Sequence, residues 1–246
     1  MKTPLTFAAI LSLSAASASA QEALRIEWGS SLVSEKIITS DGSAVTLDEF
    51  SFELGGFAGG FVPTAENINE WLDNWQVFDA ITENDPDRNG TDQSGQPASA
   101  DFFIPGGGTD ARFVAADLLD GNQNSLSADS NGTDTFGPGQ QAYVFIRNSE
   151  TTTAGSEWLL YTSEAGEVWE YPTVTSGQTQ VPLTWYVAEA DEAIWGGVNG
   201  STLGGGEFSD SSSDFVLRTH TFIPEPSVAL FSALSGLLLL VRRSRA

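Results

Sequence analysis

Short runs of β-forming residues, separated by glycine-rich turns, fill the middle of this 246-residue chain and constrain its fold more than any other feature. Strands favour β-branched and aromatic residues, in alternation with polar ones or in short apolar runs that end at turn residues. We therefore predict a mainly β fold, a single β-sandwich-like domain with one or two short helices. The predicted strands are residues 24–28, 142–146, 157–161, 167–171, 182–187 and 215–222.

Turn and helix patterns add local detail to this prediction. The sequence Glu164-Ala165-Gly166 lies between two predicted strands, so residues 157–171 are expected to form a β-hairpin. One helix is predicted over residues 65–75 and a second, shorter one over residues 188–195. The first helix has four apolar residues at helical spacing, which should pack onto a sheet, and Thr64 as N-cap. These apolar residues are Ile68, Trp71, Leu72 and Trp75.

The first 20 residues have the layout of a secretory signal peptide. Lys2 supplies a positive start, an apolar and small-residue stretch follows, and Ala18-Ser19-Ala20 forms an A-x-A cleavage site. Cleavage there leaves Gln21 as the mature N-terminus and implies export by the Sec machinery. The alternative is an ordinary first helix, which the small residues before Gln21 disfavour.

The last 23 residues begin with Pro224-Glu225-Pro226 and continue with an uncharged stretch over residues 227–241. As a helix this stretch measures about 22 Å. A bilayer core is about 30 Å thick, so the arginines that follow must snorkel to extend the span. The positive-inside rule keeps such arginines in the cytoplasm, so the tail should hold the preceding domain outside. The basic residues are Arg242, Arg243 and Arg245.

This order of parts resembles the PEP-CTERM sorting signal of Gram-negative bacteria. The resemblance implies that an exosortase, an integral-membrane transpeptidase-like protease, recognises the tail and processes it near Pro-Glu-Pro. It also implies transient membrane anchorage and then a place in the cell envelope or outside the cell, in association with exopolysaccharide. A plain single-pass anchor is the alternative. The predicted parts are a signal peptide (1–20), an extracytoplasmic β domain (21–223) and a sorting signal (224–246).

The body of the chain carries a looser resemblance. Residues 52–57, the pair Pro63-Thr64, residues 71–75 and the downstream run 157–160 are similar to segments of PEP-CTERM proteins from Verrucomicrobia and Planctomycetes. That resemblance implies no activity for this chain.

Charge and composition exclude several function classes. The chain has 33 acidic and 10 basic residues, a net charge of −23 at pH 7, so nucleic acid is not expected as a partner. It has no cysteine and one histidine, His220, which excludes disulfides, cysteine nucleophiles and metal sites built from several histidines. An excess of carboxylates does attract divalent cations.

The best candidate for a metal site is a calcium loop over residues 85–92. Ca²⁺ prefers oxygen ligands at alternate positions and a glycine at the sharp turn, which Gly90 supplies. Gln96 stands where such loops carry a bidentate Glu, so a solvated, turn-rich loop is the favoured alternative. Residues 129–134, the echo loop, repeat this pattern of Asp, Asn and Gly in a shorter form. The candidate ligands are Asp85, Asp87, Asn89 and Asp92.

Paired carboxylates are the remaining route to catalysis, because two of them suffice for glycoside hydrolysis. No pair stands out among so many acids. His220 could act as a base, but it lies in a predicted strand and no nucleophile motif accompanies it, so a role as a surface residue of the strand is favoured for His220. The pairs that could act are Glu49 with Glu53, Glu167 with Glu170, and Asp191 with Glu192.

Aromatic residues in neighbouring predicted strands offer a ligand-binding surface. Trp158, Trp169 and Trp185 could stack on sugar rings, although core packing is the favoured role for tryptophans at such positions. Three functions therefore stay open: a noncatalytic envelope or matrix protein sorted through its tail, which is favoured, a polysaccharide-binding module, and a secreted glycoside-active enzyme. No cofactor is expected except the candidate Ca²⁺.

Overall fold

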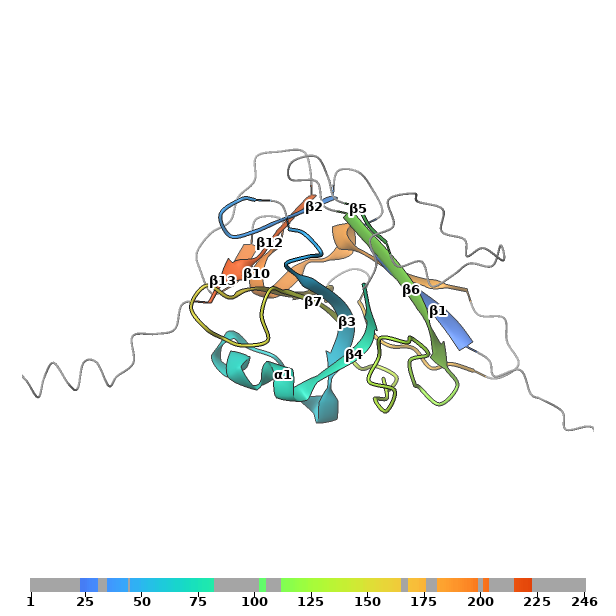
Figure 1. Cartoon of the computed structure of the whole chain (residues 1–246). Helices are drawn as coiled ribbons and strands as arrows, with labels where there is room; N and C mark the ends of the chain where they lie inside the picture. The colour runs from blue at the N-terminus through green and yellow to red at the C-terminus, as the bar shows by residue number, and fades with distance from the viewer. Residues whose placement is uncertain are drawn as a thin grey trace, which may run out of the picture.

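The structure of the protein is a computed structural model with strands in two sheets (Figure 1). Its mainly β character confirms the mainly β part of the prediction made from the strand patterns. Of the described residues, only Trp71–Asn74 form an α-helix. The structure describes residues 23–30, 35–43, 45–81, 102–104, 112–164, 168–175, 181–198, 201–203 and 215–222.

The smaller sheet has the strand order β5-β6-β1-β9. β1 is antiparallel to β6, with Ala23 opposite Asp120, and parallel to β9, with Trp28 opposite Trp185. Alternate residues of β1 are buried, as its apolar and polar alternation predicts. The strands are β1 (Ala23–Gly29), β5 (Phe102–Ile104), β6 (Arg112–Asp120) and β9 (Leu183–Tyr186).

The larger sheet runs in the order β2-β12-β10-β8-β7-β3-β4, with β11 paired to β10 and β13 to β8. Its pairs are antiparallel apart from β2 with β12. The strands are β2 (Glu35–Ile38), β3 (Ser51–Phe57), β4 (Trp75–Ala80), β7 (Tyr143–Arg147), β8 (Glu157–Thr162), β10 (Glu192–Val198), β11 (Ser201–Leu203), β12 (Phe215–Arg218) and β13 (His220–Thr221).

The helix predicted over residues 65–75 is present with two differences. A 3-10 helix, η2 (Ala65–Glu70), precedes α1 (Trp71–Asn74), and Trp75 already begins β4. Thr64 is the N-cap residue of η2, and its backbone N–H donates to Oδ1 of Asn67 at 2.8 Å. Two shorter 3-10 helices are η1 (Ala58–Gly60) and η3 (Val187–Glu189).

Two local predictions are wrong. The second helix is reduced to η3, because residues from Glu192 onward pair with β8 as strand β10. The predicted hairpin does not form, because β8 pairs with β7, β10 and β13 instead. Among the described residues 168–171 of its expected second strand, the only β-bridge joins Glu170 to Gln141. In both cases the pairing available in the sheet outweighs the local sequence pattern.

Two hydrophobic clusters cover the two faces of the larger sheet. The main cluster combines side chains from both sheets, for example Ile26 and Phe113 of the smaller sheet with Phe52 and Ile146 of the larger one. A second cluster contains Phe145 and Trp158 of the larger sheet with residues of η2 and α1. The strands β3, β7 and β8 are therefore buried almost along their whole length.

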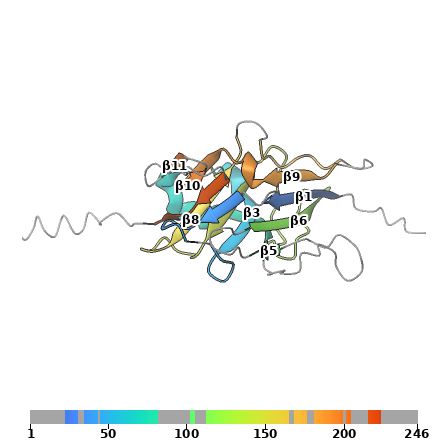
Figure 2. The same cartoon turned by 90° about the horizontal axis from the view of Figure 1, so that it is seen from above.

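The described chain begins and ends at opposite ends of the molecule. In Figures 1 and 2 the strand β1 lies at the end formed by the smaller sheet, whereas β8, β10 and the last strand lie toward the other end. The predicted strand over residues 215–222 is broken at Thr219, whose N–H donates to the carbonyl of Ile38 at 2.9 Å. Before this break the chain pairs with β10 as strand β12, and after it the chain pairs with β8 as strand β13.

Gly55 in β3 tests this packing. A Cβ at Gly55 would lie 2.1 Å from the carbonyl oxygen of Gln76 and 2.7 Å from the ring of Trp75. We expect Gly55→Ala to lower the free energy of unfolding by about 3 kcal/mol, the upper range of overpacking costs. Urea unfolding followed by tryptophan fluorescence measures the change. Gly137→Ala is the control, since its Cβ meets nothing within 4 Å, and equal effects of the two variants would contradict this account.

Candidate functional site

The three tryptophans considered as ligand contacts are buried. Trp158, Trp169 and Trp185 are exposed to 0, 1 and 2%. Trp158 packs in the second cluster and donates from Nε1 to the carbonyl of Ser149 at 3.0 Å. Trp169 and Trp185 stack on each other in the main cluster with centroids 6.2 Å apart. Sugar stacking needs an exposed ring face, so the structure removes these residues as surface ligand contacts and shows them in core packing.

A different set of residues forms a surface groove of about 400 Å³. It is lined by residues 59–62 and 137–141 together with Phe57 and Tyr143, and none of these residues carries a charge. We call it the glycine groove, because its walls include four glycines. Phe61 is half-buried and Val62 is 68% exposed, so apolar side chains face the solvent there.

Strand pairing brings the two walls of the glycine groove together. Gly55 lies opposite Tyr143 in the β3–β7 pair, so the end of β3 and the chain before β7 are neighbours. Gly59 and Gly60 have φ of 62° and 78°, which lets the chain turn after β3. Gln140 links the walls, since its Nε2 donates to the carbonyl of Phe57 at 3.2 Å and its Oε1 accepts from Gly137 N–H at 2.9 Å.

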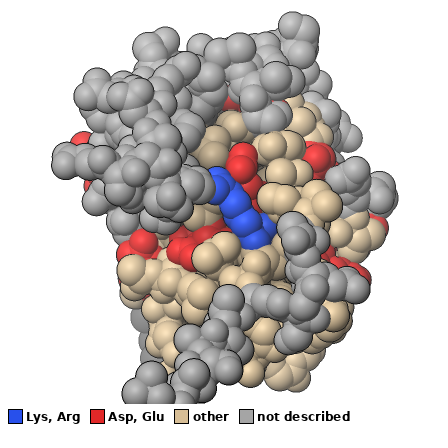
Figure 3. Space-filling model, turned by 90° about the vertical axis from the view of Figure 1, so that its right-hand side faces the viewer, with Lys and Arg blue, Asp and Glu red and all other residues tan. Residues whose placement is uncertain are grey.

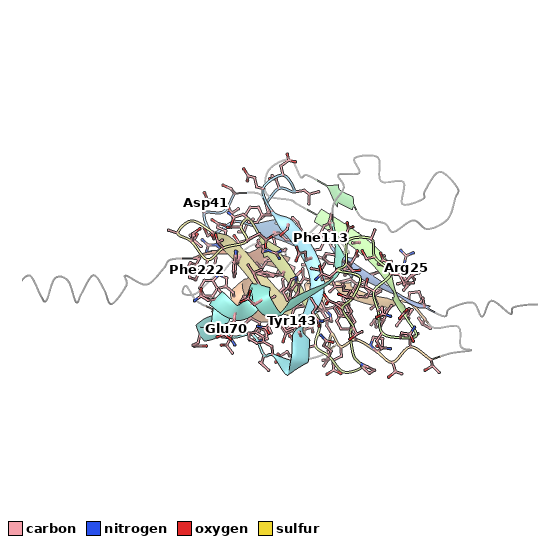
Figure 4. The ribbon with its side chains drawn as sticks, turned by 60° about the horizontal axis from the view of Figure 1, so that its bottom comes forward. Arg25, Asp41, Glu70, Phe113, Tyr143 and Phe222 are labelled. Carbon is pink, nitrogen blue, oxygen red and sulfur yellow. The ribbon has the colours of Figure 1, made fainter. Side chains whose placement is uncertain are left out.

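Tyr143, which Figure 4 labels, is the residue of the groove lining that carries a phenol hydroxyl. Its ring is 93% buried against Phe57, with centroids 5.4 Å apart, and no described residue is hydrogen-bonded to its hydroxyl. Burial, with smaller effects from Glu164 and Glu192, raises the pKa of Tyr143 to about 12. The hydroxyl therefore stays protonated at neutral pH and is able to donate a hydrogen bond.

A second groove of about 510 Å³ lies beside the ends of β3 and β7 and is charged. Arg147 in its wall makes a bidentate ion pair with Glu53, with Nη1–Oε2 and Nη2–Oε1 distances of 2.7 and 2.9 Å. Trp75 Nε1 also donates to Glu53 Oε2 at 2.7 Å. Arg147 reaches outward to Glu150 at 3.0 Å. Glu53, one of the acids considered for catalysis, is thus occupied by the core.

The Glu53–Arg147 pair is expected to be important for stability. Glu53→Gln leaves the Arg147 charge buried without its full partner, a loss of about 3–5 kcal/mol in the free energy of unfolding. Glu150→Gln is the control, because the Glu150 side chain is 73% exposed and should contribute under about 1 kcal/mol. Chemical unfolding of both variants measures the difference, and comparable small losses would show that the buried pair is not structural.

The other acids considered for catalysis are dispersed. Glu49 is exposed in the wall of the charged groove. Asp191 and Glu192 lie before and in β10, where burial and then Glu164 and Asp191 raise the pKa of Glu192. Glu170 is exposed, and Glu167 lies outside the described residues. His220 is half-buried in β13, with its ring 5.1 Å from that of Trp195.

Asp79 in β4 is a fully buried carboxylate that the sequence did not single out. It accepts hydrogen bonds from Trp28 Nε1 at 2.8 Å and from Ser127 Oγ at 2.9 Å. Burial outweighs these bonds and, with a contribution from Asp117, raises the pKa of Asp79 to about 7. Burial also raises the pKa of Asp117. Asp79 joins β4 to β1 and to the loop after β6, but it lies inside the core.

The raised pKa of Asp79 predicts a pH-dependent stability. The folded state binds the Asp79 proton more tightly than the unfolded state does. The contribution of this proton to the free energy of unfolding is therefore complete below about pH 4 and is lost as the pH rises through about 7. The loss is at most about 4 kcal/mol. Asp79→Asn should remove this component from unfolding curves measured between pH 4 and 8. Asp73→Asn, at an exposed position, controls for the change in net charge. The prediction fails if Asp79→Asn and wild type lose the same stability over this range.

Several predicted site residues lie outside the described residues. They include the calcium ligands Asp85, Asp87, Asn89 and Asp92, the cleavage residues Ala18, Ala20 and Gln21, and the whole sorting signal. In the echo loop, which is described, Asn131 Nδ2 donates to Asp134 Oδ2 at 2.9 Å. The described part of the chain holds no group of three potential metal-ligating side chains. No helix within the described ranges is long and apolar enough to cross a membrane.

Sequence reasoning missed the glycine groove. The available pattern was the pair of turn sequences Gly59-Gly60 and Gly137-Pro138-Gly139, but only the β3–β7 pairing shows that they are neighbours.

Comparisons with known proteins identify no relative. No family model matches the chain, and neither a curated protein nor a solved structure is similar to it.

Proposed function

We propose that this protein is an exported, noncatalytic component of the cell envelope or extracellular matrix, which an exosortase sorts through its C-terminal tail. The proposal rests on Ala18-Ser19-Ala20 at one end of the sequence and on Pro224-Glu225-Pro226 with its apolar stretch and arginines at the other. Between them we propose one β-sandwich-like extracytoplasmic domain, residues 21–223.

The positions of the first and last strands are the structural observation that supports this proposal. β1 begins at Ala23, two residues after the proposed mature N-terminus Gln21. At the other end, β13 pairs with β8, and the N–H of Phe222 donates to the carbonyl of Ser156 at 2.6 Å. The folded body therefore fits between the two processing sites with almost no linker.

The short connection after Phe222 has a consequence for placement. Only Ile223 separates Phe222 from Pro224, and an extended residue spans at most about 3.6 Å. While the tail stays in the membrane, the β13 end of the body is held at the membrane surface and the β1 end points away from it (Figure 1). Processing of the tail would then release the body into the envelope or matrix.

The acidic surface suits a protein of the cell envelope or extracellular matrix. The chain has 33 acidic and 10 basic residues. On the side drawn in Figure 3, the basic side chains form one narrow strip with acidic side chains around it. Like charges keep exported bodies apart from one another and from anionic surfaces, and they attract cations of the medium.

Mass spectrometry of the protein from its native host tests this proposal. The wild-type protein should begin at Gln21 and should lack part or all of residues 224–246. A Pro224→Ala/Pro226→Ala double variant should keep the complete tail and stay in the membrane fraction, because the proposed recognition motif is gone. Pro182→Ala, an exposed proline of the body, is the matched control and should be processed as wild type. An intact Met1 would refute export, and an intact wild-type tail in a host with an active exosortase would refute sorting.

A further inference from the structure

The glycine groove differs in charge from the rest of this protein. The eleven described residues that line it carry no charge, in a chain with a net charge of −23. An anionic ligand would be repelled by the protein as a whole, and a cation would meet no carboxylate among the described lining residues. The groove therefore suits an uncharged ligand.

The chemistry of the walls narrows the ligand class further. Phe61 stacks near Phe57 with centroids 5.3 Å apart, and the exposed Val62 and Pro138 add apolar surface. Polar groups are few: the amides of Gln140 and Gln141 and the phenol of Tyr143. Binding sites of small ligands combine apolar and aromatic walls with a few polar groups in this way, in volumes from about 300 Å³ upward.

The phenol of Tyr143 points to a ligand with hydroxyl groups. A tyrosine hydroxyl that reaches the protein surface can donate and accept a hydrogen bond. No described residue supplies one to Tyr143, whereas Gln140 and Gln141 are already bonded within the protein. A pyranose ring has apolar C–H faces for the aromatic and aliphatic wall and hydroxyl groups for the phenol.

We propose that the glycine groove binds a neutral carbohydrate, with the apolar wall of Phe61 and Val62 against the face of a sugar ring and the Tyr143 hydroxyl bonded to one of its hydroxyls. This inference goes beyond sorting through the tail and does not depend on it, because the groove belongs wholly to the folded body.

Affinity electrophoresis of the full-length chain tests the proposal. Native gels contain a dissolved neutral polysaccharide (a galactomannan, a β-glucan or dextran) or an anionic one (alginate or polygalacturonate), and retardation is measured against a gel without polysaccharide. We expect at least one neutral polysaccharide to retard the wild type. Val62→Asp places a charge in the groove and should weaken binding about tenfold or more, since a sugar would desolvate the carboxylate. Tyr143→Phe should weaken it about 3- to 10-fold, the loss of one hydrogen bond.

Val181→Asp is the matched control. Val181 is 85% exposed and is not among the residues of the groove, so this variant makes the same charge change elsewhere and should bind as wild type. Tryptophan fluorescence checks that each variant is folded.

Several results would overturn the proposal. They are the absence of retardation by every neutral polysaccharide, retardation by the anionic ones alone, equal binding of Val62→Asp and Val181→Asp, or unchanged binding of Tyr143→Phe. If the groove is instead a contact between two copies of the chain, no polysaccharide would retard the wild type. The Val62→Asp variant would then sediment with a lower mass than the wild type. None of these outcomes bears on processing of the tail, so the two proposals fail separately.

Discussion

Burial of the larger sheet on both faces is the constraint on which the rest of the structure depends. Every residue of β7 is buried, because the main cluster covers one face and the second cluster covers the other. Polar groups in these strands must then find partners inside the protein. Arg147 at the end of β7 does so with Glu53 of β3, and Glu53 also accepts from Trp75. This ion pair and the hydrogen bond from Trp75 thus tie β3, β7 and β4 together where the second cluster is built.

The second cluster also explains the neutral groove. Ile68 of η2 and the aromatic rings of α1 and β4 cover the outer face of β7 and β8, with Trp71 and Trp158 stacked at 6.2 Å. Tyr143 and Phe57, which belong to this cluster, also line the groove beside the glycine turns at residues 59–60 and 137–139. The glycine groove is therefore an uncharged region on a surface that carries carboxylates elsewhere, and two of its lining residues belong to the core. The rings that stabilise the sheet and the ring that carries the phenol are parts of one packed layer.

Strands with a strong local pattern were predictable, and those that depend on partners were not. The alternation of β1 and the apolar runs of β7, β8 and β9 predicted strands that the structure contains. The nine-residue β6 and the strand β3 were missed, because Gly55-Gly56 and Ala115-Ala116 are weak β-formers. Their burial against aromatic neighbours stabilises them. The prediction of a hairpin after β8 was wrong because strand pairing depends on partners elsewhere in the sheet, and β8 pairs with β7 and β10.

The sequence by itself determined the strongly acidic charge, the mainly β class and the helical stripe before β4, because charge, β-propensity and spacing are local properties of the chain. Only the tertiary structure decided that Trp158, Trp169 and Trp185 are core residues, that Glu53 neutralises Arg147, and that Asp79 is a buried acid. It also decided that residues 59–62 and 137–141 share one groove. These facts depend on which strands pair and on what covers each face, and such contacts join residues far apart in the sequence.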